Sequence, residues 1–289
     1  MFGECHAHIF MNGYNYKEAV ELHRGHVDRE SICRWFCEYK KRGVVFIRDG
    51  GDALGVSEYA KGIAGEYGID YRTPVFAIHR KGRYGSIVGR EFETMKEYRE
   101  LVAEVKRRGG DFIKIMLSGI MDFNHCGTVT SIPLKKEEIC EMIHIAHEEG
   151  FAVMAHVNGA QTVKEAALAG VDSVEHGNYL DEECIRVMAR QGTLWVPTLA
   201  TVRNLIGCGR FPDEEVTAIW HRAAKNLRLA YRLGVPLALG SDAGAYLVPH
   251  GQGIFDEYEA FREVLGDGER LDGMLAENEK RLKERFQRK

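Results

Sequence analysis

The N-terminal stretch Met1-Phe2-Gly3-Glu4-Cys5-His6-Ala7-His8-Ile9-Phe10 decides how the rest of the chain is interpreted. His6 and His8 stand two positions apart in a short apolar run. On a β-strand, the side chains of residues i and i+2 leave the same face, so both imidazoles would point to one place. Two neighbouring imidazoles suit a divalent metal ion, and the alternative is a pair of surface histidines near a frayed terminus. The pair therefore indicates a metal site only if further ligands arrive from other strand ends.

Short apolar runs alternate with longer helical patterns eight times along the chain. We expect strands at residues 2–9, 44–49, 71–78, 112–117, 152–157, 173–176, 194–199 and 236–241. Helices are expected at residues 29–42, 57–67, 94–108, 135–149, 161–169, 181–191, 213–233 and 254–265. Eight strand–helix units in 289 residues fit the α/β class and, within it, a (β/α)8 TIM barrel. An open doubly wound sheet is the alternative, but no GxGxxG follows the first strand.

Composition limits the class of protein. No linker or shift in composition divides the chain, so we expect a single domain over residues 1–289, closed by a charged helix at residues 267–289. The net charge of −4 gives no indication of nucleic acid or an anionic membrane as partner. No apolar run approaches the ~20 residues of a membrane helix, and the N-terminus does not resemble a secretion signal. Seven scattered cysteines predict free thiols and a cytoplasmic location.

Function in a TIM barrel gathers at the carboxyl ends of the strands. Six residues able to bind a metal stand at such ends: His6, His8, Lys114, His156, His176 and Asp242. One histidine there is more often a satisfied polar residue than a ligand, but six such residues at one mouth argue for a metal centre. Lys114 lies inside an apolar run, where an unpaired ammonium is costly to bury. It either pairs with Asp111 or Asp49, or reacts with carbon dioxide to form a carbamate able to bridge two metal ions.

Five motifs resemble the metal motifs of the amidohydrolase superfamily: His6-Ala7-His8, Gly110-Asp111-Phe112-Ile113-Lys114-Ile115-Met116, Ala155-His156, Val174-Glu175-His176-Gly177 and Gly240-Ser241-Asp242-Ala243-Gly244. Within that superfamily, the chain is most similar to the branch of imidazolonepropionases, enamidases and Xaa-Pro dipeptidase-type hydrolases. The resemblance implies a distorted barrel with a binuclear centre, most typically of two Zn²⁺ ions. His6, His8 and Asp242 would hold one ion, and His156 and His176 the other. Carboxylated Lys114 would bridge both, with a hydroxide between them.

The chain departs from that family pattern in two places. It starts on the first strand and stops soon after the last helix, so we expect it to lack the β-sandwich that usually flanks the barrel. The segment Leu117-Ser118-Gly119-Ile120-Met121-Asp122 is also less glycine-rich than is usual in the branch, so this loop is expected to reshape the pocket.

The resemblance implies a metal-dependent hydrolase that cleaves an amide, imide or peptide C–N bond of a small substrate. Asp242 would take a proton from the attacking water and return it to the leaving nitrogen. Alternatives are a mononuclear deaminase, a lactonase or phosphotriesterase using the same site, and a non-catalytic metal-binding barrel. Five residues just past strand ends are candidates for contact with the substrate: His79, Arg83, Tyr179, Arg203 and His250. An arginine among them would suit a substrate carboxylate. The sequence leaves open whether the chain forms a homo-oligomer.

Overall fold

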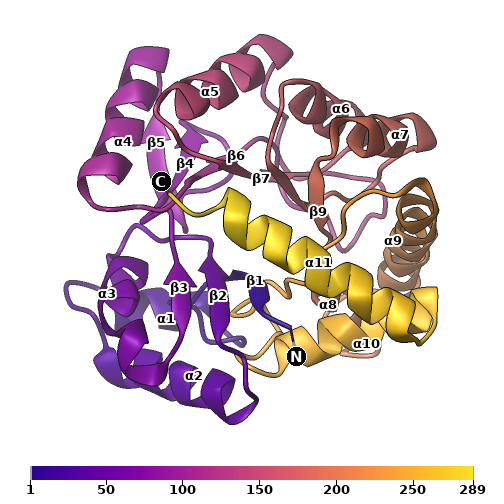
Figure 1. The fold of residues 1–289 in the computed structure, drawn as a ribbon, viewed down its shortest axis with the longest axis horizontal. Coiled ribbons are helices and arrows are strands. Elements are labelled where there is room, and N and C mark those ends of the chain that lie inside the picture. The colour runs from indigo at the N-terminus through magenta and orange to yellow at the C-terminus, as the bar shows by residue number, and fades with distance from the viewer. Residues whose placement is uncertain (1, 289) are drawn as a thin grey trace.

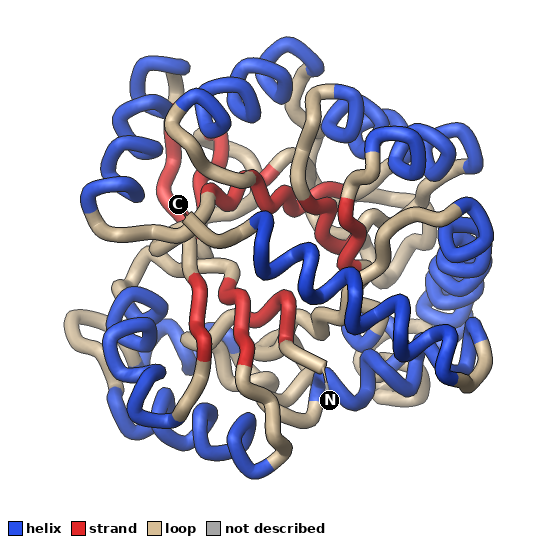
Figure 2. Tube along the Cα trace, viewed as in Figure 1, coloured by secondary structure: helices blue, strands red, loops and turns tan. Residues whose placement is uncertain are grey.

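The computed structural model describes residues 2–288, whose strands form two parallel sheets (Figure 1). One sheet has the strand order β1-β2-β3, and the other has the order β5-β4-β6-β7-β8-β9. The strands are Glu4–Ala7 (β1), Phe46–Asp49 (β2), Asp70–Arg72 (β3), Ala77–Arg80 (β4), Gly89–Phe92 (β5), Ile113–Met116 (β6), Val153–Val157 (β7), Ser173–His176 (β8) and Leu194–Val196 (β9). Figure 2 shows them surrounded by helices. Met1 and Lys289, the ends of the predicted domain, lie outside the described residues.

The helices follow most of the predicted bounds. They are Tyr16–Leu22 (α1), Arg29–Lys41 (α2), Val56–Ile63 (α3) with the 3-10 helix Ala64–Tyr67 (η1), Met95–Arg107 (α4), Lys136–Glu148 (α5), Ala160–Leu168 (α6), Glu182–Gln191 (α7), Ala200–Arg203 (α8), Asp213–Leu233 (α9), Gly253–Leu265 (α10) and Glu269–Arg285 (α11). Local signals set their ends: Thr94 and Glu97 form a capping box at the start of α4, and Gly192 ends α7 with a φ of 64°. None of the helices in residues 2–288 is long and apolar enough to cross a membrane.

The predicted strand at residues 71–78 is wrong as a single element. Its first part is β3, which pairs with β2, and its last part is β4, which pairs with β6. Between them, Pro74 has no amide hydrogen to donate, and Val75 has a φ of 69° that no regular strand adopts. The sequence analysis also missed β5, α1 and α8, which are short and carry no clear apolar period.

The predicted last strand, residues 236–241, is not a regular strand either. Isolated parallel bridges join Trp195 to Leu237 and Ala7 to Ala243, so this segment runs between β9 and β1. The structure thus confirms an α/β fold with parallel strands. Closure of all the strands into one (β/α)8 barrel remains a prediction, because the described ladders form two sheets.

The C-terminal helix α11 lies across the strands in Figure 1. Leu282 and Phe286, both fully buried, pack against residues at the amino ends of strands, including Phe46, Phe112 and Leu194. Burying one such aromatic side chain contributes about 2–3 kcal/mol. This helix therefore closes the amino-terminal side of the sheets, opposite the edge where the candidate ligands stand.

Candidate functional site

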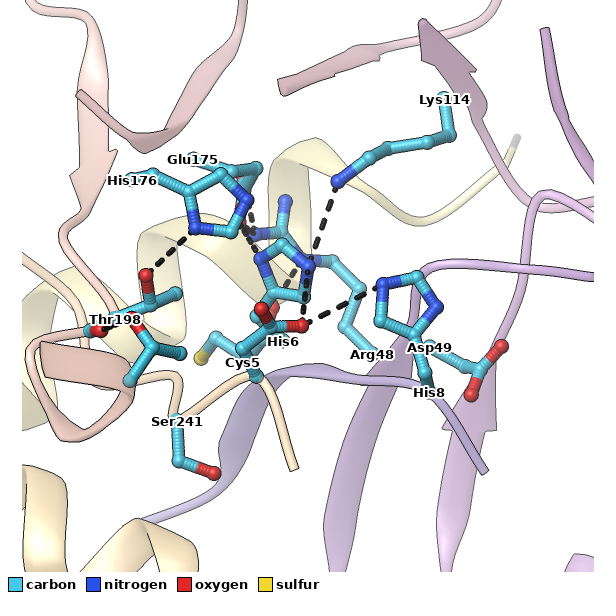
Figure 3. A network of polar contacts seen from close by, with 12 residues as sticks. Cys5, His6, His8, Arg48, Asp49, Lys114, Glu175, His176, Thr198 and Ser241 are labelled. Carbon is cyan, nitrogen blue, oxygen red and sulfur yellow. Dashed lines mark hydrogen bonds and ion pairs between the residues drawn. The ribbon is translucent and has the colours of Figure 1, made fainter. Parts of the chain in front are cut away.

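The candidate site lies at the carboxyl ends of the strands, where Figure 3 shows several of its side chains. β1 supplies His6 and is followed by His8, β6 supplies Lys114, β7 supplies His156, β8 supplies His176, and Asp242 follows residues 236–241. The five basic side chains are buried, and the Asp242 side chain is 16% exposed. Since parallel strands end at a common edge, the strands and the segments that follow them bring the six predicted ligands into one region.

Asp242 joins the two N-terminal imidazoles. Its Oδ1 lies 3.5 Å from Nε2 of His6 and 3.5 Å from Nε2 of His8. The backbone fixes this approach, because Asp242 N donates to the carbonyl oxygen of His6 at 2.8 Å. One ligand atom from each of the three residues lies within 4.8 Å of the others. We call the six candidate ligands the cluster, and His6, His8 and Asp242 its first half.

Hydrogen bonds on the far side of each ring determine which nitrogen faces Asp242. Nδ1 of His6 lies 2.8 Å from Glu175 Oε2, and Nδ1 of His8 lies 3.4 Å from the carbonyl oxygen of Gly51. A carboxylate and a carbonyl only accept, so Nδ1 carries the hydrogen in both rings. The Nε2 lone pairs are therefore free to bind a metal ion beside Asp242.

His156 and His176 are named the second half of the cluster. Their ring centroids are 4.6 Å apart, and the His176 ring lies 5.1 Å from that of His6. Nδ1 of His176 lies 2.7 Å from Thr198 Oγ1, and Nε2 of His156 lies 3.2 Å from the carbonyl oxygen of Gly119. The carbonyl of Gly119 only accepts, so His156 carries its hydrogen on Nε2 and has its lone pair on Nδ1. The hydroxyl of Thr198 can donate or accept, so either tautomer of His176 fits this contact. The group of donors within 4.8 Å of one another does not include these two imidazoles.

Lys114 is buried beside the first half, with Nζ 3.5 Å from Nε2 of His6. Burial lowers the pKa of its ammonium to about 8, against the attraction of nearby carboxylates. The prediction that Asp111 could pair with Lys114 is wrong, because the Asp111 carboxylate pairs with Lys61 at 2.7 Å. Asp49, the other expected partner, accepts backbone hydrogen bonds and raises the Lys114 pKa only weakly.

Burial controls the charge of the cluster. It lowers the pKa of His8 and of His156 to about 3, and it holds the pKa of His6 and of His176 well below the usual value. All four imidazoles are therefore neutral near pH 7, which is the form that binds metals. Burial also raises the pKa of Asp242 to about 6, opposed by the Lys114 ammonium.

The donor set of the first half fits a divalent metal ion. Two neutral imidazole nitrogens and one carboxylate oxygen converge in a buried place, and zinc, iron, manganese and nickel all accept such ligands. The second half offers two imidazoles, one ligand fewer than the three side chains that proteins usually give a catalytic zinc ion.

The backbone is strained where it presents these side chains. His176 has a φ of 66°, Asp242 a φ of 61° and Thr198 a φ of 50°. Residues other than glycine are uncommon in this left-handed region, and such strain gathers at functional sites. The surrounding structure therefore holds these residues in place to direct their side chains.

Two of the predicted substrate residues have their polar groups engaged elsewhere. Nε of Arg203 pairs with Glu263 at 2.8 Å. The ring of His250 is held at both nitrogens, by Tyr39 Oη at 3.1 Å and by the carbonyl oxygen of Met11 at 2.9 Å. Within residues 2–288, no hydrogen bond or ion pair joins either side chain to the six candidate ligands, although His250 lies near enough to His8 to contribute to the lowering of its pKa.

The other three predicted substrate residues belong to the carboxyl-terminal side of the strands. His79 is buried in β4, with Nδ1 3.1 Å from a backbone carbonyl, Arg83 is exposed in the loop after β4, and Tyr179 is half-buried after β8. Tyr84, which was not among the predicted site residues, has its ring centroid 4.9 Å from that of His156. The loop after β4 therefore places the aromatic ring of Tyr84 beside His156 of the second half.

The sequence analysis missed a buried ion pair beneath the cluster. Nη2 of Arg48 lies 2.9 Å and 3.0 Å from the two carboxylate oxygens of Glu175, and both side chains are fully buried. Each residue stands in an apolar strand, where a charge is costly unless it is paired. The sequence could have revealed the pair, because a charged residue inside an apolar strand is the same signal that singled out Lys114.

The geometry first defines a class: a parallel α/β protein with imidazoles, a lysine and an aspartate at the carboxyl edge of its strands. A sequence profile described as "Amidohydrolase family" matches residues 61–265. The chain belongs to the amidohydrolase family. The match includes four of the six candidate ligands and begins after His6 and His8.

Sequence relatives share part of the chain. An uncharacterized protein of Mycobacterium tuberculosis is 31% identical over 194 residues, which are 65% of this chain and 51% of that protein. The ochratoxinase of Aspergillus niger is 29% identical over 153 residues, which are 51% of this chain and 32% of that enzyme. The chain thus spans about half the length of the first relative and about a third of the second.

Solved structures share the fold over most of the chain. A Xaa-Pro dipeptidase with bound methionine superposes with a TM-score of 0.70 at 20% identity, covering 95% of this chain and 75% of that one. The structure of A. niger ochratoxinase gives a TM-score of 0.72 at 23% identity, covering 94% of this chain and 68% of that one. At these identities the likeness is one of fold.

Proposed function

We propose that this chain is a metal-dependent hydrolase that cleaves an amide, imide or peptide C–N bond of a small substrate. The observation that carries the proposal is the buried convergence of His6, His8 and Asp242 within 4.8 Å, in a chain of the amidohydrolase family. In this proposal the strand–helix units form one distorted (β/α)8 domain, and its mouth holds the cluster.

Each half of the cluster would hold one divalent ion, with Zn²⁺ the expected occupant of these nitrogen and oxygen ligands. Lys114 would supply the anion that the second half lacks. Its amine nitrogen would form a bond to the carbon of CO2 and lose one proton, which leaves a carbamate with two oxygens. The lowered pKa of about 8 supports this step, because only the neutral amine reacts.

Bound metal would lower the pKa of water and polarise the substrate carbonyl. Asp242 would handle the proton: Oδ1 would take it from the attacking water and deliver it to the leaving nitrogen as the C–N bond breaks. The backbone bond from Asp242 N to His6 would hold the carboxylate in position for both proton transfers.

The substrate class follows from the relatives and from the loops. The similar structures include a Xaa-Pro dipeptidase and a prolidase complexed with N-methylphosphonate-L-proline. We therefore propose a dipeptide-like substrate with a free carboxylate. The exposed guanidinium of Arg83, on the loop beside Tyr84, would suit that carboxylate by its paired donors.

The experiment is a hydrolysis panel with zinc-replete protein: Xaa-Pro dipeptides, their C-terminal amides, an imide, a lactone and an amino-heterocycle. We expect turnover of the free dipeptides above that of their amides. Asp242→Asn should keep its folded state and lose roughly 10²–10⁴-fold in turnover, the usual contribution of a general acid–base group. The control is Asp267→Asn, since that exposed carboxylate pairs with Arg262 and should leave the rate unchanged.

Other outcomes point to the alternatives. Undiminished hydrolysis by Asp242→Asn would remove Asp242 from its role. Ammonia released only from the amino-heterocycle would favour a deaminase, and turnover of the lactone alone would favour a lactonase. Equal rates on dipeptides and their amides would remove the carboxylate preference.

A further inference from the structure

Arg48 and Glu175 form a fully buried network beneath the first half of the cluster (Figure 3). Arg48 donates from Nη2 to both carboxylate oxygens of Glu175, from Nη1 to Ser173 Oγ at 2.8 Å, and from Nε to the carbonyl oxygen of Cys5 at 2.7 Å. Ser173 Oγ in turn donates to Glu175 Oε1 at 2.5 Å. Hydrogen bonds donated by Arg48 and Ser173 therefore hold the Glu175 carboxylate in one orientation.

The remaining contact of this carboxylate is with a candidate ligand. Glu175 Oε2 lies 2.8 Å from Nδ1 of His6, whose other nitrogen faces Asp242. A carboxylate oxygen only accepts hydrogen bonds, so Nδ1 of His6 must be the donor in this contact. The hydrogen of the His6 imidazole therefore stays on Nδ1.

The four candidate imidazoles differ in this respect. The far nitrogen of His8 and that of His156 each meet a backbone carbonyl, and that of His176 meets the hydroxyl of Thr198. Among these four rings, His6 is the one whose far nitrogen meets a carboxylate in the described residues. A carboxylate on the far nitrogen fixes the ring and raises its basicity as a ligand.

Stability alone does not account for the ion pair. A buried Arg–carboxylate pair gives little net stability relative to apolar residues of similar size, because both charges lose their hydration. The chain nevertheless encloses this pair. The Arg48 guanidinium carbon lies 4.4 Å from the ring centroid of Phe286, the residue after α11, and 6.0 Å from that of Phe112, so both rings help to keep water from it.

We propose that Glu175 is a positioning residue that fixes the tautomer of His6 for metal binding. Arg48 holds the Glu175 carboxylate, which keeps the hydrogen of His6 on Nδ1. The Nε2 lone pair is then directed at the place shared with Asp242. This inference rests on the proposed function, since the tautomer matters to activity only if His6 is a metal ligand.

The test uses two variants of the full chain. Glu175→Gln keeps the size of the side chain but places an amide NH2 against one of its donors. The double variant Arg48→Met/Glu175→Leu removes both charges together and leaves His6 no acceptor. Two quantities are measured: the zinc dissociation constant by chelator competition, and the His6 tautomer by ¹⁵N NMR of metal-free protein.

We expect both variants to bind zinc about 10–100-fold more weakly than wild type, the usual effect of losing such a partner. In the double variant, His6 should also populate the tautomer with hydrogen on Nε2. Glu263→Gln is the control, because this partly exposed carboxylate pairs with Arg203 and should change neither quantity.

Folded variants with the zinc affinity and the His6 tautomer of wild type would overturn the positioning role. A wild-type protein that binds no zinc would refute the proposed function instead. The tautomer measurement needs no metal, so it still decides whether Glu175 orients His6.

Discussion

The two halves of the cluster are built differently. In the first half, a carboxylate lies 3.5 Å from both imidazoles. In the second half, two imidazoles face each other with ring centroids 4.6 Å apart, and their other partners are a hydroxyl and a carbonyl. The first half can therefore bind a metal with its own side chains. The second half offers two imidazoles alone, and in our proposal the carboxylated Lys114 adds the anionic ligand.

Replacing Lys114 is the strongest way to separate the two halves. In Lys114→Gln no carbamate can form, so we expect turnover to fall at least as far as the roughly 10²–10⁴-fold lost with a general acid–base group. The measurement is dipeptide hydrolysis after zinc is restored to chelator-stripped protein, with and without bicarbonate. Wild type should recover fully only with bicarbonate.

The matched control is Lys61→Gln, because Lys61 pairs with Asp111 outside the cluster. It should behave as wild type. Turnover by Lys114→Gln within a few-fold of wild type would show that the second half works without a bridging anion.

Gly50→Ala should damage the first half alone. A Cβ at Gly50 would lie 2.8 Å from Nε2 and 2.9 Å from Nδ1 of His8, closer than packed atoms approach, so the ring would have to move. The loss of one orienting contact should weaken zinc binding by about 10–100-fold. The assay is chelator competition, with Gly62→Ala in α3 as the control, since a Cβ there meets no atom within 4 Å.

Unchanged zinc affinity in Gly50→Ala would mean that His8 does not need its described position. A loss of the same size in Gly62→Ala would point to a general effect of the added methyl group.

His250 is a reference imidazole that belongs to neither half. It is buried, and burial lowers its pKa from 6.5 to about 4. Between pH 4 and 6.5, His250 is therefore protonated in the unfolded chain and neutral in the folded chain. The stability contributed by its lowered pKa is fully present above pH 6.5 and is lost as the pH falls toward 4. The difference corresponds to about 3 kcal/mol.

Urea unfolding of wild type and His250→Gln, with chelator present, measures this effect. The variant should be less stable at pH 7, and the difference in free energy of unfolding between the two proteins should narrow by pH 4. In a separate assay without chelator, the two zinc-replete proteins should contain the same amount of zinc. The four cluster imidazoles add the same pH trend to both proteins. Parallel pH curves would contradict the assignment.

The strand-end ligands were predictable because parallel strands deliver their carboxyl ends to one edge. His6, His156 and His176 needed only a correct strand and its end, and Lys114 was found as a charged residue inside an apolar strand. The bond between His6 and Glu175 could not be foreseen in the same way, because it joins residues 169 positions apart through side-chain geometry.

Loop residues were predicted less well. Arg203 and His250 follow strand ends in sequence, but their partners, Glu263 and Tyr39, come from helices whose packing no local pattern specifies. The close approach of Gly50 to His8 is likewise a tertiary contact. The break within residues 71–78 was open to prediction, because Pro74 marks it.

The metal content of zinc-replete protein, purified with bicarbonate and freed of excess metal, tests the central claim most directly. The account predicts two zinc ions per chain in wild type and one in Lys114→Gln, the remaining ion being held by the first half. A wild type without bound zinc, or two ions in both proteins, would contradict it.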